Sequence, residues 1–168
     1  DGKDNDCDGL VDCDDPDCLG KACNPANPNF QCRSAGGSVT CTDTSSLYSL
    51  VLTATRPDPW SGSSGTRLPA DGSSQTVIGA TLKYDGAAVT GATVTFASSL
   101  AGTTVSAAPV TDAQGHTAAT FTSSANGGTA VVTVSHLPGG APGATPVTAT
   151  VSIDMPLLGQ IRLQSQQY

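Results

Sequence analysis

The stretch TAVVTVSH, residues 129–136, alternates apolar and polar side chains, and this two-residue period decides the fold. Successive side chains of a β-strand point to opposite faces of a sheet. Val132 and Val134 would therefore face a core, while the residues between them face solvent. A short run with this period is typical of a half-buried strand. The stretch predicts one strand of an antiparallel sheet.

Six more alternating runs surround this one. They cover residues 46–54, 75–84, 92–98, 103–108, 116–123 and 145–153, and turn clusters such as DGAA, TDAQG, ANGG and PGGAPG separate them. Short strands at such intervals, without helical periodicity, predict an all-β fold, an antiparallel β-sandwich of the immunoglobulin type. The residues expected to face its core are Leu50, Leu52, Val77, Ile78, Leu82, Val94, Phe96, Val105, Phe121, Val132, Val134, Val147 and Val151.

The composition changes ahead of residue 46. Residues 1–45 contain nine Asp and three basic residues, a net charge of −6 within a total of −7. The remainder is nearly neutral, and no basic stripe is present to replace the counterions of nucleic acid, so we do not expect nucleic acid as a partner.

The change in composition divides the chain into three expected parts: an Asp/Cys-rich segment at 1–45, a sandwich at 46–155, and a linker or first strand of a following module at 156–168. An added edge strand on this sandwich is the alternative for the last part.

The cysteines all lie in the first part. They are Cys7, Cys13, Cys18, Cys23, Cys32 and Cys41. An even number in a short, loop-rich stretch predicts a disulfide framework with little regular structure, formed in an oxidising compartment. A zinc site is the alternative, although no CxxC pair and no nearby His supplies the usual ligand spacing. Of the possible pairings, one candidate joins Cys32 to Cys41 around a turn at Gly36 and Gly37.

The Asp spacing in DGKDNDCDGLVDCDDPDC, residues 1–18, matches a twelve-residue calcium loop. The oxygen-donor positions fall on Asp4, Asp6, Asp8, the Leu10 carbonyl, Asp12 and Asp15, and Gly9 takes the sharp turn. Asp at the last position is a departure, because its arm is shorter than that of the usual Glu. Asp1, Asp14 and Asp17 remain for a possible second metal site; a solvated acidic turn is the alternative.

This segment resembles the Asp/Cys-rich putative metal-binding repeat in surface proteins of myxobacteria and their relatives, and is similar to thrombospondin type 3 calcium repeats. Some proteins with such repeats are described as copper binders. Copper prefers imidazole, thiolate or thioether ligands, and the segment contains neither His nor Met. The residues themselves favour Ca²⁺.

The body carries a second resemblance. The stretches ADGS (70–73), VTGATVTF (89–96), TDAQG (111–115) and GTAVVTV (128–134) follow one another in order. This pattern resembles the group 1 bacterial immunoglobulin-like domain of invasin and intimin, whose members are mostly stalk or display modules of surface adhesins. The turn in KYDGAAV is shorter than the turn usual in the family, and RPDPWSGSSGTRLP (56–69) is an insertion.

Trp60, the only Trp, lies in that insertion. An exposed aromatic side chain can anchor a partner, so Trp60 is a possible ligand contact; a side chain folded over the sandwich edge is the alternative. No nucleophile elbow, phosphate loop or zinc-protease helix occurs. His116 and His136 are expected to be surface residues of strands. The chain is not expected to be an enzyme.

The sequence shows no signal peptide and no apolar run long enough to span a membrane. We expect an extracellular or bacterial cell-surface module that does not insert into membranes. Its partners would be neighbouring modules or a cell-surface partner. Two functions are compatible with this expectation: a stalk segment stiffened by calcium, and an adhesin tip that binds a carbohydrate or protein through the Trp60 loop or through calcium.

Overall fold

The computed structural model describes residues 13, 18–24, 29–35, 38–55, 66–106, 110–138 and 144–157. The elements are β1 (Phe30–Ala35), β2 (Ser38–Asp43), the 3-10 helix η3 (Ser45–Leu47), β3 (Tyr48–Thr55), β4 (Gln75–Tyr84), β5 (Ala87–Ala88), β6 (Thr95–Ser98), β7 (Thr104–Val105), β8 (His116–Thr122), β9 (Gly128–His136) and β10 (Val147–Met155). The predicted strands of the body are all present within a few residues of their expected bounds.

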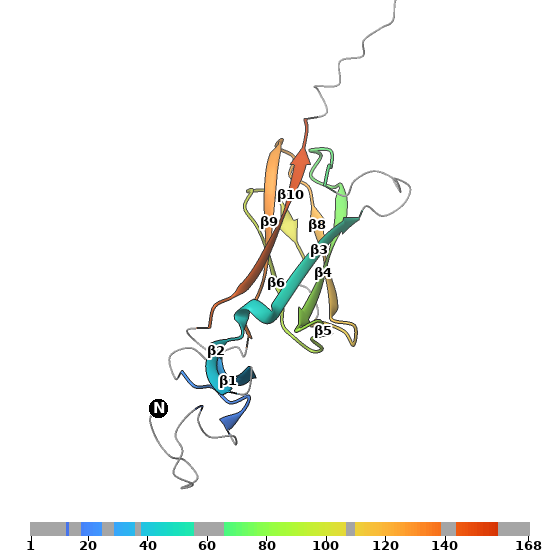
Figure 1. Ribbon diagram of the computed structural model, residues 1–168. Coiled ribbons are helices and arrows are strands. Elements are labelled where there is room, and N and C mark those ends of the chain that lie inside the picture. The colour runs from blue at the N-terminus through green and yellow to red at the C-terminus, as the bar shows by residue number, and fades with distance from the viewer. Residues whose placement is uncertain are drawn as a thin grey trace, which may run out of the picture.

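Two antiparallel sheets form the body (Figure 1). One has the strand order β3-β4-β8-β7, with the two-residue β5 beside β4, and the other has the order β10-β9-β6. Leaving β5 aside, the first, second, fifth and fourth strands share one sheet, and the third, sixth and seventh share the other. This is the arrangement of a constant-type immunoglobulin domain. The body is therefore an immunoglobulin-like β-sandwich.

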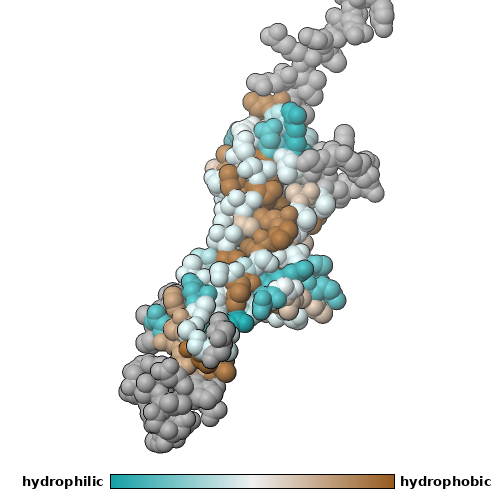
Figure 2. All heavy atoms as spheres, viewed as in Figure 1, coloured by the Kyte–Doolittle hydropathy of each residue, from teal (hydrophilic) through white to brown (hydrophobic). Residues whose placement is uncertain are grey.

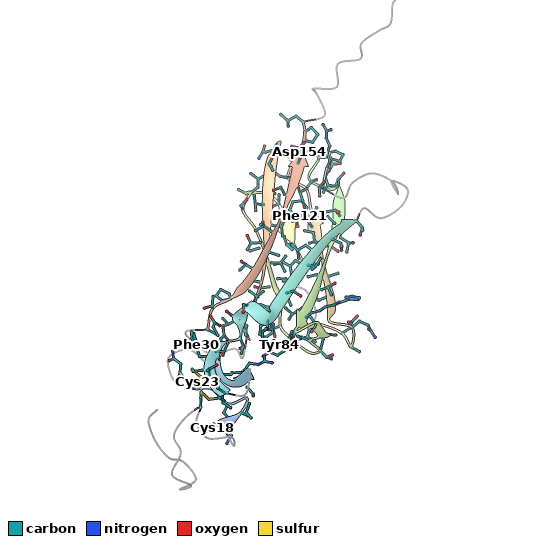
Figure 3. The ribbon with its side chains drawn as sticks, in the orientation of Figure 1. Cys18, Cys23, Phe30, Tyr84, Phe121 and Asp154 are labelled. Atoms are coloured by element: carbon teal, nitrogen blue, oxygen red, sulfur yellow. A yellow bond between two sulfur atoms is a disulfide. The ribbon has the colours of Figure 1, made fainter. Side chains whose placement is uncertain are left out.

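The core lies between the two sheets, where the inward positions of each strand meet. Figure 3 shows Phe121 there, and its side chain is fully buried. The buried cluster comprises Leu68, Ala70, Ile78, Ala80, Leu82, Val94, Phe121, Ala130, Val132, Val134, Ile153 and Met155. Leu50, Leu52, Phe96, Val105 and Val151 are half-buried and pack against it, as the alternation predicts. Figure 2 shows apolar atoms gathered between β3 and β10.

The prediction was wrong for two of the residues expected in the core, Val77 and Val147. Val77 and Ile78 are adjacent on β4, so their side chains must point to opposite faces. The structure buries Ile78 completely and leaves Val77 half-buried on the outer face, opposite Thr120 of β8. Val147, the first residue of β10, is also half-buried and lies outside the core cluster.

The chain passes through the sandwich from one end to the other (Figure 1). Apart from the two-residue β5, the seven strands of the body alternate in direction along the chain. An odd number of such strands brings the chain in at one end of the sandwich and out at the opposite end. β3 begins at the end where β1 and β2 lie, and β10 ends at the far end, where Figure 3 shows Asp154.

The cysteine-rich segment contains more regular structure than the sequence predicted. β1 and β2 form an antiparallel hairpin in which Phe30 faces Asp43 and Ala35 faces Ser38. The expectation of an irregular segment was therefore wrong for these strands. The strand signal was weak because RSAGGSVT offers little apolar alternation, and a single hairpin is marginal without other support.

Candidate functional site: the disulfide-linked segment and its joint to the sandwich

The predicted metal ligands cannot be placed. Asp4, Asp6, Asp8, Leu10, Asp12 and Asp15 lie outside the described residues, as do Asp1, Asp14 and Asp17 of the possible second site and Trp60. Calcium binding and the Trp60 contact therefore stay predictions. The structure does describe the framework that follows the Asp-rich loop and its attachment to the sandwich.

Two disulfides hold this framework. Cys13 is bonded to Cys32 and Cys23 to Cys41, with Cα–Cα distances of 5.1 and 5.9 Å. The suggested bond between Cys32 and Cys41 was wrong, although the two residues do lie opposite each other in the hairpin. Each bonds instead to the segment that precedes the hairpin, which closes longer loops and so removes more freedom from the unfolded chain. Cys7 lies outside the described residues, so its pairing stays a prediction.

The segment at 18–24 lies against β1 and is joined to it by backbone hydrogen bonds. The Gly20 amide donates to the Cys32 carbonyl at 2.8 Å, and the Cys32 amide donates to the Lys21 carbonyl at 3.0 Å. The Cys23 amide donates to the Phe30 carbonyl at 2.9 Å. Cys32 is 1% exposed, so the disulfides lie where the segment, β1 and β2 meet. The disulfide bonds stabilise this segment in place of an apolar core, which its composition cannot supply.

The sulfur atoms of Cys13, Cys23 and Cys32 lie within 4.8 Å of one another. Such a group can in principle hold a metal, but zinc binds cysteine as the thiolate. All three sulfurs are bonded in disulfides here. The arrangement therefore favours the disulfide interpretation over the zinc alternative.

A first set of contacts joins the hairpin to the sandwich through Asn29. The Thr44 amide and hydroxyl both donate to the Asn29 carbonyl, at 2.8 and 2.7 Å. The Asn29 side-chain amide donates to the carbonyl of Thr145, just before β10, at 3.4 Å. Asn29 and Thr44 are 3% and 2% exposed, so the hydrogen bonds between them are shielded from water, whereas the bond to Thr145 is only partly buried. The start of the hairpin is thus fixed to Thr44, between β2 and β3, and to Thr145, just before β10.

A second set of contacts centres on Arg33 of β1. Its guanidinium donates to the Tyr84 hydroxyl at 2.8 Å and lies 3.7 Å from the Asp85 carboxylate. The guanidinium carbon is 5.9 Å from the centroid of the Tyr84 ring, within the range of a cation–π contact. Figure 3 shows Tyr84 at the end of the sandwich that faces the hairpin. Three different interactions therefore converge on one side chain.

The Tyr84 ring is supported by an aromatic group behind it. Its centroid lies 4.7 Å from that of Tyr48 on β3, and Tyr48 lies 5.6 Å from His136 on β9. Burial, with a smaller contribution from Tyr84, raises the pKa of Tyr48. His136 was expected at the surface and is instead 8% exposed, because the period of β9 turns it inward after Val134. Its Nδ1 lies 2.9 Å from the Thr93 carbonyl.

An open groove of about 730 Å³ lies elsewhere, on the outer face of the sheet over β3, β4 and β8. Its lining includes Thr53, Gly79, Val110, Asp112, His116 and Ala118. The Asp112 carboxylate accepts hydrogen bonds from the His116 and Gln114 amides at 2.8 and 2.9 Å, and these bonds lower its pKa. The Asp112 carboxylate thus holds the turn before β8.

Sequence reasoning missed Arg33, Tyr84 and Asp85 as a group. A turn signal was available, because Asp85 and Gly86 form the DG dipeptide of a tight hairpin. Asp85 does adopt a positive φ of 49°. Nothing in the local pattern indicated that this turn meets a residue of another segment, since Arg33 precedes Asp85 by more than fifty positions.

Two solved structures of bacterial adhesins are similar to the chain. Adhesin InvE of Yersinia pseudotuberculosis is 30% identical over 64% of this chain and 26% of its own, with a TM-score of 0.45. The D00–D0 domain of intimin is 21% identical over 63% of this chain and 46% of its own, with a TM-score of 0.48. The chain thus spans about a quarter of the first structure and under half of the second. No protein-family model and no curated protein sequence matches it.

Across the described ranges, no helix is both long and apolar enough to cross a membrane. The body that follows the disulfide-linked segment is, by its strand order, an immunoglobulin-like sandwich.

Proposed function

We propose that the chain is a non-enzymatic module of a bacterial cell-surface or secreted protein, acting as a stalk or adhesin segment. One observation carries the proposal: the chain enters the sandwich at one end and leaves it at the other, and the disulfide-linked hairpin lies in line at the entry end (Figure 1). Modules built in this way can follow one another and extend a chain away from a surface. The resemblance of the body to invasin- and intimin-type domains supports the same interpretation.

The Asp-rich loop ahead of the hairpin is proposed to bind one calcium ion. The ligands would be Asp4, Asp6, Asp8, Asp12, Asp15 and the Leu10 carbonyl. Two unit charges about 4 Å apart in water repel by roughly 1 kcal/mol, and by more near a protein surface. Five carboxylates that converge on one point would therefore hold the empty loop open, and a divalent cation would reverse this and order the loop. Even a weak site, with a dissociation constant of about 10⁻⁴ to 10⁻³ M, suits an extracellular module.

Isothermal titration of the chelator-stripped protein with calcium tests this proposal. We expect saturable binding that Asp8→Ala weakens at least tenfold. The matched control is Asp154→Ala, which removes an exposed carboxylate at the far end of the sandwich and should leave the affinity unchanged. Absence of calcium binding, or equal affinities for Asp8→Ala and the wild type, would show that these carboxylates serve another purpose.

The stalk proposal also has a competitor, a ligand-binding tip that uses the Trp60 loop. Glycan-array retention of the wild-type protein that is lost in Trp60→Ala would favour this tip function. Retention by neither protein favours the stalk.

A further inference from the structure

We propose that Arg33 locks the disulfide-linked hairpin onto the sandwich, so that the two form one rigid body whether or not calcium is bound. The inference goes beyond the proposed function, because it assigns the stiffness of this joint to protein contacts. Calcium would then order only the loop ahead of the hairpin. The joint comprises Arg33, Asn29, Thr44, Tyr84, Asp85 and Thr145.

The covalent connection across the joint is short. β2 ends at Asp43 and β3 begins at Tyr48, and the residues between them form the single turn η3. The Asp43 carboxylate accepts a hydrogen bond from the Ser45 amide at 2.9 Å, and hydrogen bonding from Ser45 lowers the pKa of Asp43. Thr44 is buried between them. A connection of four residues, with Thr44 buried and the Ser45 amide bonded to Asp43, leaves little freedom for a hinge.

Two separate contacts then fix the orientation of the hairpin about this connection. The side-chain amide of Asn29, just before β1, donates a hydrogen bond to the Thr145 carbonyl, just before β10. Arg33, in the middle of β1, is bonded to Tyr84 at the end of β4. A tether alone permits rotation, whereas a tether with two contacts to different parts of the sandwich, one before β10 and one at the end of β4, restricts it.

The sandwich presents a preformed site for Arg33. Asp85 is held in its positive-φ conformation by its own amide, which donates to the Leu47 carbonyl at 2.9 Å. Tyr84 is supported from behind by Tyr48. Because these partners are already in place, the guanidinium loses little additional freedom when it binds them. Its hydrogen bond to the phenol fixes direction, and the carboxylate adds charge complementarity.

A comparison with Arg67 shows why Arg33 is more than a surface ion pair. The Arg67 guanidinium lies 3.6 Å from the Asp154 carboxylate at the opposite end of the sandwich, and both side chains are mostly exposed. Isolated pairs of that kind contribute little. Arg33 is more buried, at 36% exposure of its side chain, and it adds a hydrogen bond and an aromatic contact to its ion pair. The two arginines therefore form a matched pair for an experiment.

The experiment measures amide residual dipolar couplings of the whole ¹⁵N-labelled chain, once in chelator and once in excess calcium. In the wild type, amides of 29–43 and of the sandwich should fit one alignment tensor with equal order under both conditions. In Arg33→Met the hairpin should require its own tensor, with its degree of order at least twofold lower. Arg67→Met, which makes the same change at the other end, should behave as the wild type.

A second variant guards against a folding defect of the hairpin itself. Tyr84→Phe with Asp85→Asn removes the hydroxyl that accepts from Arg33 and the charge of its ion-pair partner, keeps the aromatic ring, and retains a residue that tolerates a positive φ. This variant should lower hairpin order in the same direction as Arg33→Met, while the Cys13–Cys32 and Cys23–Cys41 bonds persist by mass spectrometry.

Three results would overturn the inference: unchanged order in Arg33→Met, unchanged order in the double variant, or a wild-type hairpin that aligns with the sandwich only in calcium. The last result would leave the calcium proposal intact. Conversely, a chain that binds no calcium by titration yet aligns as one body would refute the calcium proposal and support the locked joint.

Discussion

Replacing Gly115 with Ala should destabilise the sandwich far more than the same change at another positive-φ glycine. Gly115 closes the turn that begins at Asp112, with a φ of 76°. A Cβ at this position would collide with the carbonyl oxygen of Leu82 and would approach the Val89 amide nitrogen to 3.2 Å and the Ala88 Cα to 3.4 Å. All three are backbone atoms, so no side-chain rotation relieves the clash.

The expected cost has two parts. The left-handed conformation costs an Ala about 1 kcal/mol relative to Gly. Overpacking against fixed atoms costs typically 1–3 kcal/mol more, and here it also strains the hydrogen bond from the Leu82 amide to the Gly115 carbonyl, 2.9 Å long. The control is Gly91→Ala: Gly91 has a φ of 71°, and a Cβ there would have open space around it. The control carries only the first part, so the two variants should differ by about 2 kcal/mol.

Urea unfolding followed by far-ultraviolet circular dichroism measures both variants against the wild type. With equal m-values, the difference appears in the midpoint concentration. In thermal unfolding, each kcal/mol corresponds to roughly 4–8 °C for a domain of 60–100 residues and to less for a larger one. If Gly115→Ala is no less stable than Gly91→Ala, the close approach of the turn to β4 does not constrain this position and the reasoning is refuted.

Three further outcomes follow from other parts of the structure. Ile78→Ala should cost about 2–5 kcal/mol in urea unfolding and Val77→Ala under about 1 kcal/mol, and equal costs would contradict the assigned faces of β4. Four hydrogen bonds, led by those from Ser74, hold the pKa of Asp71 far below its ordinary value, so the stability that this carboxylate provides is complete above that value, 3.8, and is lost as the pH falls below it; Asp71→Asn should flatten that acid limb. Non-reducing peptide mapping should recover Cys7 linked to Cys18, and alkylation of either thiol in the unreduced protein would refute the pairing.

Much of the sandwich follows from local pattern. The alternation in β9 predicted both its length and its buried face, because a period of two admits only one set of inward positions once a core exists. The same reasoning located β4, β8 and β10 within a few residues. One of its errors was at Val77, where the sequence placed two apolar residues side by side and only the register decided which of them is buried.

Of the core residues missed by sequence reasoning, Ala80, Ala130, Ile153 and Met155 lie at inward positions of strands, whereas Leu68 lies outside regular alternation. Leu68 follows the insertion and is 1% exposed, because its amide donates to the Asp154 carbonyl and so fixes this segment beside β10. Met155 at the end of β10 is buried at the same end of the sandwich. Leu68 has no neighbouring pattern that indicates a strand, so its burial depended on a contact between distant segments.

The sequence by itself determined the acidic head, the crowding of cysteines into it, the calcium-type spacing and the immunoglobulin-like class of the body. These depend on composition and short periods, which are local properties of the chain. Tertiary structure alone decided which cysteines are bonded, because the sequence does not distinguish among the fifteen possible pairings of six cysteines. It also decided the joint, where Arg33 meets Tyr84 and Asp85 across 51 positions. Such contacts arise from the way folded surfaces fit together, and no local periodicity encodes them.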